Sequence, residues 1–192
     1  VRGLVHRLDR PASGVMELSR TSKAASRLSA QFRDRAPMKR YLALVEGDPG
    51  ADHGERTDFL KKTYTPERGT RVVVVEPGDP DGKRAHLRWT RLGVQDGRSL
   101  VEVELLTGRA HQIRVQLAAL GTPIVGALRY GARPEHDGQN LALHSYGLAF
   151  EHPVRRDPRV FTAPPPATWT GPLADFARAH VATWGEQQGD AS

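Results

Sequence analysis

The sequence predicts an α+β fold with a mixed, mainly antiparallel sheet flanked by helices. More segments carry strand patterns than helix patterns, and the strand segments follow one another in hairpin-like runs separated by turn signals. The chain has 192 residues, which is enough for one domain with a genuine core. No repeat with a period of roughly 20 to 50 residues is visible, so solenoids and propellers are excluded.

The first elements are a short strand and a helix. We expect the strand at Val15–Leu18 and the helix at Thr21–Arg35, because apolar side chains recur there at helical spacing. Thr21 or Ser22 can cap the start of the helix, and Pro37 ends it.

The middle of the chain reads as a series of strands. Lys39–Glu46 is apolar on both faces, which predicts a strand inside a sheet. Gly47–Thr70 is polar and rich in Gly, Asp and Lys, so we expect a loop or a weak hairpin there. Three further strands are separated by turn signals, at 71–76, 84–92 and 99–106.

The last third of the chain contains two predicted helices and one predicted strand. A helix is expected at Arg109–Leu120, with Thr107 as a possible cap and Gly121 as its stop. The remaining expected segments are a strand at 141–150, a proline-rich connector at 153–166, a helix at 173–184 and a frayed tail at 185–192.

The charge balance favours a polyanionic partner. There are 28 Lys and Arg residues against 22 Asp and Glu, which gives a formal net charge of +6. Much of the positive charge is arginine, which binds phosphate in a forked geometry. A basic protein of this size favours nucleic acid, although composition alone leaves open a soluble protein with a slightly basic surface.

Missing residue types exclude several kinds of site. There are no cysteines, which excludes disulfides, thiol nucleophiles and Cys-ligated zinc. The histidines show no close metal spacing, and no dinucleotide or phosphate-loop fingerprint occurs, so we expect neither metal nor cofactor. No apolar run approaches the ~20 residues of a membrane helix and no signal peptide is visible, so we expect a cytoplasmic protein without a membrane partner.

The segment VHRLDRPASGV carries one acid, Asp9, between Arg7 and Arg10. Neighbouring guanidiniums keep an aspartate ionised, and an ionised carboxylate in a partly dry pocket can act as nucleophile or base. Alone, a loop carboxylate is most often a turn former. His6 fits a hydrogen-bonding turn residue better than a catalyst.

The segment LLTGRAHQIRVQLAALG supplies cations at a helix start, which favours anions. Arg109, His111, Gln112 and Arg114 occupy the first turns of the expected helix, and His111 and Arg114 share one face. The functional interpretation is that one arginine faces the acid and another faces phosphate. A pair of surface salt bridges is the alternative.

Lys39 and Tyr41 lie two apart on one strand and therefore face the same side. Tyr41 could stack on a base and offer its hydroxyl for proton transfer. The alternative is an ordinary half-buried strand tyrosine.

Four sequence segments follow one another along the chain: VHRLDRPASGVMELSRT, MKRYLALVEG, LLTGRAHQIRVQLAALGTPIVGALRYG and LALHSYGLAFEHP. Together they resemble the successive motifs of the Rlu-type pseudouridine synthases, relatives of the bacterial large-subunit rRNA enzymes. The resemblance runs from Val5 to about Pro166. It implies the pseudouridine synthase catalytic fold and the isomerisation of uridine in RNA to pseudouridine, without ATP, metal or organic cofactor.

The resemblance also implies roles for individual residues. The family's catalytic aspartate falls on Asp9, as nucleophile or as the base in a glycal route, and its arginine partner falls on Arg114. The active-site tyrosine falls on Tyr41, and Arg7 is expected to fill the place of the extruded nucleotide. The positions expected to shape the pocket or contact RNA are Lys39, Arg109, His111 and Gln112.

The chain departs from the family pattern at several places. Family members carry a segment before HRLD, whereas this chain begins a few residues upstream of His6, so we expect an N-terminally truncated fold. Ala12 stands where threonine is usual, and Ala127 where an acid is usual. Residues 1–172 would then form the catalytic domain, and residues 173–192 a C-terminal helix with its tail.

We therefore expect an RNA pseudouridine synthase that acts as a monomer on rRNA or tRNA, with basic loops holding the RNA backbone. Two alternatives from other classes remain. One is a non-catalytic RNA-binding module, and the other is a hydrolase or nuclease that uses Asp9 and His111.

Overall fold

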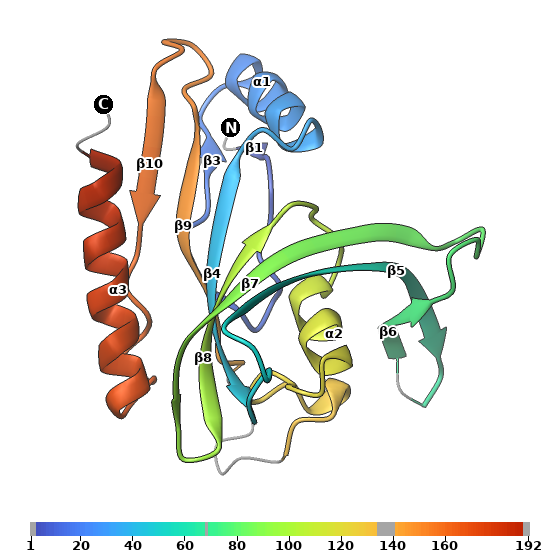
Figure 1. Cartoon of the computed structure of the whole chain (residues 1–192). Coiled ribbons are helices and arrows are strands. Elements are labelled where there is room, and N and C mark those ends of the chain that lie inside the picture. Colours follow the sequence, from blue (N-terminus) through green and yellow to red (C-terminus); the bar gives the residue numbers. More distant parts are fainter. Residues whose placement is uncertain (1–2, 68, 134–140, 190–192) are drawn as a thin grey trace. The chain divides into compact units, whose positions relative to one another are not determined.

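The computed structural model describes residues 3–67, 69–133 and 141–189, with side chains described as far as Glu186. The chain forms two compact units. The first contains residues 1–41 and 144–192, and the second contains residues 42–143. The second unit is therefore inserted between the two chain segments that make up the first (Figure 1).

Eight strands hydrogen-bond in the order β10-β9-β4-β8-β7-β5-β6, with β2 beside β9. Strand β4, Met38–Glu46, begins in the first unit and ends in the second. The pairings whose register is described are antiparallel, apart from the parallel pair β2 and β9. The predicted α+β fold with a mainly antiparallel sheet is confirmed, as is the internal position of β4.

Short strands begin the first unit. β1, Gly3–Leu4, pairs with β3, Leu18–Ser19, and β2, Ser13–Gly14, pairs with one part of β9, Leu143–Glu151. The strand predicted at 15–18 is wrong apart from its last residue. The backbone N–H of Glu17 donates to the ring of His6 instead of to a neighbouring strand, so the ladder is interrupted.

The rest of the first unit consists of two helices and an edge strand. Helix α1, Ser22–Arg33, starts as predicted: the Thr21 hydroxyl accepts the Ala24 N–H at 3.2 Å. β10, Pro158–Thr162, pairs with β9 although the sequence predicted a connector there. Its proline stands at the first position of an edge strand, where the missing N–H costs little. Helix α3, Pro172–Gly189, continues past the predicted end at Trp184.

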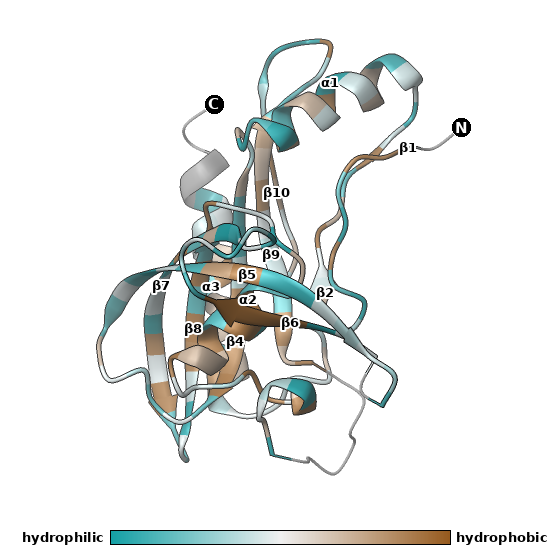
Figure 2. Ribbon diagram, turned by 90° about the vertical axis from the view of Figure 1, so that its right-hand side faces the viewer, coloured by the Kyte–Doolittle hydropathy of each residue, from teal (hydrophilic) through white to brown (hydrophobic). Residues whose placement is uncertain are grey.

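Four long strands dominate the second unit and are drawn as curved ribbons in Figure 1. Their bounds are β5 His53–Thr65, β6 Gly69–Val75, β7 Lys83–Gln95 and β8 Arg98–Leu105. β7 pairs with both β5 and β8, with a register shift between Arg91 and Gly93. The valine run of β6 is drawn in brown, the colour of hydrophobic residues, in Figure 2.

Strand β5 replaces the loop predicted at 47–70, which is the largest error of the prediction. Its inward-facing residues include Arg56 and Asp58, so the alternation of apolar and polar residues that marks a strand is absent. The two side chains pair with each other at 2.7 and 2.9 Å, which satisfies both charges. The strand is held by backbone pairing on both sides, which needs no apolar face.

Helix α2, Gln112–Ala119, begins three residues later than predicted. His111 precedes it in the left-handed region at φ 51°, so Arg109 and His111 lie in the preceding turn and not in the helix. Thr107 does not cap the helix either. Its hydroxyl instead donates to the side-chain oxygen of Gln112 at 2.8 Å. A short 3₁₀ helix, η1, follows at Leu128–Tyr130.

Each unit has its own buried core. In the first, Leu28, Leu148 and Phe150 are buried, and Val5, Val15 and Phe32 pack against them. In the second, fully buried side chains come from β7, β8, α2 and the segment after α2: Leu87, Leu100, Val101, Val103, Leu117 and Ile124. Among the described residues, no helix has the length and apolar character needed to cross a membrane.

The two ends of the second unit meet. The Leu44 N–H donates to the Ala142 carbonyl at 3.0 Å, and the Val125 N–H donates to the Leu44 carbonyl at 2.9 Å. The chain therefore enters and leaves this unit at neighbouring points.

Candidate active site

Asp9 lies in the acid segment, His6–Gly14, which belongs to the first unit. Asp9 is half-buried and Arg7 is exposed. The Ala12 N–H donates to the Asp9 carbonyl at 2.9 Å, which closes the turn predicted from the proline and glycine. The segment then joins the sheet through β2.

A serine and a histidine anchor the end of the acid segment. The His144 Nε2 lies 2.9 Å from the Ala163 carbonyl, which can only accept, so Nε2 carries the proton. The Ser13 hydroxyl therefore donates to Nδ1 at 2.8 Å. Burial lowers the pKa of His144, against a weaker opposing effect of that carbonyl, which favours the neutral ring that this arrangement requires.

Gly14 reinforces the same anchor. Its φ is +125°, and an added Cβ would lie 2.1 Å from the Ser145 carbonyl oxygen. Only glycine allows the backbone to approach β9 this closely. The sequence context P-A-S-G thus encodes a backbone contact.

His6 has a structural role in the same segment. Its Nε2 accepts the Glu17 N–H at 2.8 Å, and its ring stacks on Phe32 with centroids 4.5 Å apart. Burial, and secondarily the positive charge of Lys39, lowers the pKa of His6 to about 4. The ring is neutral at pH 7, in agreement with the predicted hydrogen-bonding turn residue.

Lys39 and Tyr41 also belong to the first unit, on β4. Burial, followed by the charge of Arg35, lowers the pKa of Lys39. Burial raises the pKa of Tyr41, against a weaker effect of its hydrogen bond with Ser145. Tyr41 therefore keeps its proton at neutral pH and can donate it.

The cation segment, Thr107–Arg114, lies in the second unit and is organised around the buried side chain of Gln112. The Gln112 oxygen accepts from the Thr107 hydroxyl at 2.8 Å and from the Arg109 N–H at 3.0 Å. Its nitrogen donates to the His86 carbonyl at 3.1 Å. One amide thus fixes the turn that leads into α2.

Three side chains and one backbone N–H contact Tyr130. The Tyr130 hydroxyl lies 2.6 Å from His111 Nδ1 and accepts the Val72 N–H at 3.3 Å. The Arg114 guanidinium carbon lies 4.9 Å from the Tyr130 ring centroid, and that of Arg71 lies 5.6 Å from it. His111 and Arg114 do share one side, as their spacing predicted, and Tyr130 is what they contact.

A partly buried ion pair supports the next turn of α2. The Gln116 amide donates to Asp58 at 2.7 Å, and Asp58 also accepts both hydrogen bonds from Arg56. This arrangement ties the helix to β5, so the position of Arg114 depends on a polar contact below it.

The structure thus groups the predicted residues in two sets. The first unit holds Arg7, Asp9, Lys39 and Tyr41. The second unit holds the predicted residues of the cation segment, which are Arg109, His111, Gln112 and Arg114. That Asp9 and Arg114 meet remains a prediction.

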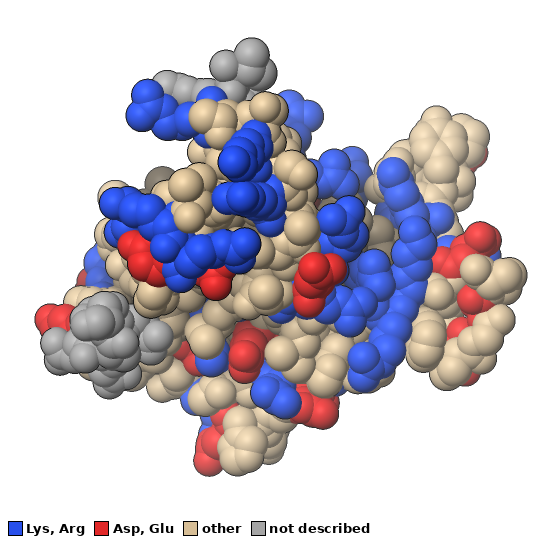
Figure 3. Space-filling model, turned by 90° about the horizontal axis from the view of Figure 1, so that it is seen from above, with Lys and Arg blue, Asp and Glu red and all other residues tan. Residues whose placement is uncertain are grey.

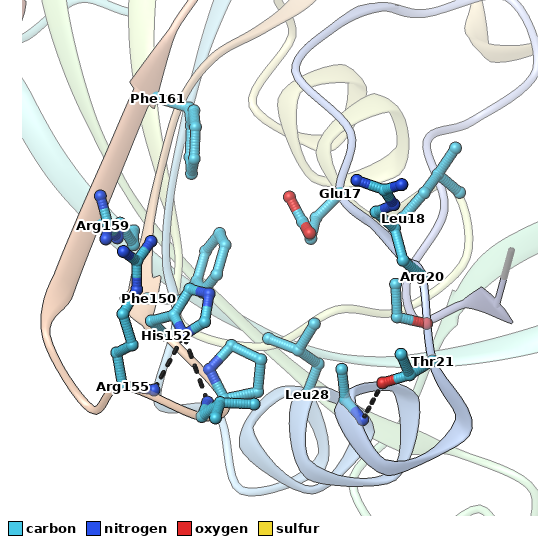
Figure 4. Close-up of a pocket in the computed structure, with 14 residues that line it drawn as sticks. Glu17, Leu18, Arg20, Thr21, Leu28, Phe150, His152, Arg155, Arg159 and Phe161 are labelled. Carbon is cyan, nitrogen blue, oxygen red and sulfur yellow. Dashed lines mark hydrogen bonds between the residues drawn. The ribbon is translucent and has the colours of Figure 1, made fainter.

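A separate cavity of about 380 Å³ lies within the first unit. Figure 4 shows Glu17 and Arg20 on one side of it, facing Phe150 and His152 of the β9 region and Phe161 of β10. None of the predicted site residues lines this cavity. The stacked Phe150 and Phe161 rings make its apolar wall.

In the view of Figure 3, Lys and Arg side chains include an elongated stripe. A row of positive side chains is the electrostatic footprint expected for nucleic-acid binding.

Sequence reasoning gave no role to Arg71, Tyr130 or His144. Tyr130 and His144 lie inside two of the sequence segments that resemble the family, so the resemblance could have marked both positions. Arg71 stands in a segment with no motif of its own. The pairing of β5 with β6 and the packing of α2 against β6 bring Arg71 to Tyr130.

Comparison with known proteins gives the family to which the chain belongs. Residues 2–119 match the family model described as RNA pseudouridylate synthase. This chain belongs to that family, whose members isomerise uridine in RNA to pseudouridine.

Curated relatives are similar over most of the chain. An uncharacterized RNA pseudouridine synthase of Zymomonas mobilis is 38% identical over 168 residues, covering 87% of this chain and 74% of that protein. The dual-specificity RNA pseudouridine synthase RluA of Escherichia coli is 36% identical over 163 residues, covering 83% and 72%. An uncharacterized RNA pseudouridine synthase of Chloroflexus aurantiacus is 40% identical, and the chain spans 50% of its length.

Two human structures share the fold. RNA pseudouridylate synthase domain containing 1 matches with a TM-score of 0.70 and 25% identity, covering 93% of this chain and 80% of that one. RNA pseudouridylate synthase domain containing 4 matches with a TM-score of 0.74 and 21% identity, covering 93% and 76%.

Proposed function

We propose that this protein isomerises specific uridines in structured rRNA or tRNA, with Asp9 and Arg114 as the central pair of its active site. The observation that carries the proposal is the family match over residues 2–119, which contains both the acid segment and the cation segment. RNA is the substrate that the family and its relatives support.

The reaction needs an ionised carboxylate at the sugar. Asp9 acts either as the nucleophile that attacks C1′ while uracil leaves, or as the base that removes the 2′ proton in a glycal route. In both routes the freed uracil turns and its C5 bonds to C1′. In the first route C5 displaces the Asp9 carboxylate from C1′, and in the second the 2′ proton returns from Asp9 to C2′ of the glycal. The C5 proton is then lost while N1 gains one. Arg114 suits the partner role because a guanidinium stays charged throughout the working pH range.

Tyr41 would contact the uracil base of the target nucleotide. Its raised pKa keeps the hydroxyl protonated, so it donates a hydrogen bond or a proton and does not act as a base at neutral pH. The flat ring also offers a surface on which an extruded uracil can stack. Lys39, two residues earlier on the same strand, faces the same side.

The remaining predicted residues bind RNA or shape the pocket. Arg7 is exposed and free to enter the stack in place of the extruded nucleotide. Gln112 is buried with both ends of its amide engaged, so it shapes the pocket by fixing the turn. Arg109 donates from Nε to the Arg84 carbonyl at 3.0 Å, which leaves its other nitrogens for RNA. We further propose a monomer that works in the cytoplasm without a cofactor.

The test compares two acid-to-amide variants. Asp9→Asn should abolish pseudouridine formation in rRNA and tRNA while RNA binding persists. Asp96→Asn, in an exposed turn, removes the same charge and should keep normal turnover. Arg114→Met should lower turnover by several orders of magnitude. Normal turnover by Asp9→Asn would remove the carboxylate from the mechanism.

The same experiment separates the alternatives. Tight RNA binding by the wild-type chain with no pseudouridine formed would indicate a binding module. Cleaved RNA that depends on added metal would indicate a nuclease.

A further inference from the structure

Tyr130 holds two guanidiniums against one ring. Arg114, on α2, and Arg71, on β6, both lie within cation–π distance of its centroid, at 4.9 and 5.6 Å. Two like charges at one ring repel each other. The face of the ring attracts both cations, and an anion bound beside them would offset their mutual repulsion.

The ring itself cannot move away. Its hydroxyl accepts the backbone N–H of Val72, the residue next to Arg71, and lies 2.6 Å from the His111 ring. Because the Val72 N–H is the donor in one contact, the hydroxyl proton is available for His111 Nδ1. Tyr130 thus ties β6 to the start of α2.

Some arginines of this unit carry an ion pair. Arg56 pairs with Asp58, and Arg91 pairs with Asp48 at 2.6 Å. Arg71 has no ion pair with any residue that the structure describes, and its Nε is buried without a hydrogen-bond partner. A buried, unsatisfied N–H on a cation costs on the order of 1 to 3 kcal/mol, and a phosphate bound at the terminal nitrogens of the same guanidinium would offset that cost.

We propose that Arg71 binds a phosphate of the substrate RNA, beside the nucleotide that Arg114 serves. The proposal rests on the proposed function, because that function supplies both the RNA and the active-site role of Arg114. A guanidinium offers forked donors that match phosphate oxygens. The shared ring fixes the separation of the two cations, so the phosphate that Arg71 binds belongs to a nucleotide near the reacting one.

The first measurement is the salt dependence of RNA binding. Arg71→Gln should weaken binding of a structured tRNA transcript about tenfold. The slope of log affinity against log salt should become shallower by about 0.7 to 0.9, the value for one lost phosphate contact. Arg71→Lys should keep the slope but lose part of the affinity, because it keeps the charge without the fork.

Lys62→Gln is the matched control. Lys62 is exposed on β5 and pairs in register with Val72. The substitution removes one positive charge from the same hairpin. It should change the slope much less than Arg71→Gln. An unchanged slope for a folded Arg71→Gln, or an equal change for Lys62→Gln, would overturn the proposal.

Kinetics provide a second readout. On an RNA that the wild type modifies, Arg71→Gln should raise KM about tenfold and leave kcat nearly unchanged, because phosphate binding acts equally on ground and transition states. Tyr130→Leu should lower kcat as well, since Arg114 loses its support, whereas Tyr130→Phe keeps the ring. A wild type that forms no pseudouridine would defeat the proposed function. An active wild type with unchanged Arg71→Gln kinetics would defeat only this inference.

Discussion

The acid segment and the cation segment are held in place by different means. Residues His6–Gly14 are fixed at their end by the close backbone approach of Gly14 to β9, in addition to the side-chain hydrogen bonds of His6 and Ser13. Residues Thr107–Arg114 are fixed by side chains, above all by the three hydrogen bonds of Gln112. The position of the Asp9 carboxylate therefore depends on a close backbone contact, and the position of the Arg114 guanidinium depends on a network of buried hydrogen bonds.

This difference predicts which substitutions each segment tolerates. A segment placed by backbone contact should be most sensitive to an added carbon atom. A segment placed by buried hydrogen bonds should be most sensitive to loss of one partner, because the others are then left unsatisfied.

The largest effect should come from Gly14→Ala. The new Cβ would lie 2.1 Å from the Ser145 oxygen at φ +125°, so β2 must leave β9. We expect the free energy of unfolding to fall by about 3 kcal/mol or more, with loss of activity. Gly50→Ala is the control, because Gly50 has φ +80° but no atom within 4 Å. Its cost, measured by urea denaturation, should be about 1 kcal/mol, and equal losses would contradict the steric explanation.

A smaller effect is expected from Gln112→Leu. The substitution keeps the volume but leaves the Arg109 N–H and the His86 carbonyl without their partner. The free energy of unfolding should fall by about 2 to 3 kcal/mol and kcat should fall with it. Gln95→Leu, at the end of β7, makes the same chemical change and should cost less than about 0.5 kcal/mol. Normal turnover by Gln112→Leu would show that the network does not position Arg114.

The smallest effect concerns pH. The pKa of His6 falls from 6.5 to about 4 in the folded protein, mainly through burial. Between pH 6.5 and 4, His6 binds a proton in the unfolded chain but stays neutral in the folded chain. The free energy of unfolding should therefore decrease as pH falls from 6.5 toward 4. In His6→Gln the Tm should vary less over this range. Calorimetry measures the difference, with the exposed His53→Gln as control, and identical curves for wild type and His6→Gln would exclude the contribution.

Local patterns predicted the elements whose buried faces are apolar. Helix α1 and strands β4, β8 and β9 were placed within a few residues because their periodicity reflects their burial. Strand β5 was missed because its inner face carries an ion pair. β10 was missed because proline was taken to exclude a strand, although an edge position accepts it.

The site was predicted less completely than the fold. The motifs indicated Asp9, Tyr41 and Arg114, and the spacing placed His111 and Arg114 on one side. The start of α2 was wrong because His111 adopts the left-handed region at φ 51°, so Arg109–His111 form a turn before the helix, held by the Gln112 amide. Arg71 could not be found, because contacts between distant segments define its place.

The meeting of Leu44 with Ala142 has a consequence for how the molecule assembles. The first unit is built from two stretches of polypeptide separated by residues 42–143. Closing a flexible loop of roughly a hundred residues costs ~4 kcal/mol of chain entropy. Once the inserted unit has formed, its entry and exit are already joined by a hydrogen bond, so most of that loss has been met before β9 and the N-terminal stretch come together.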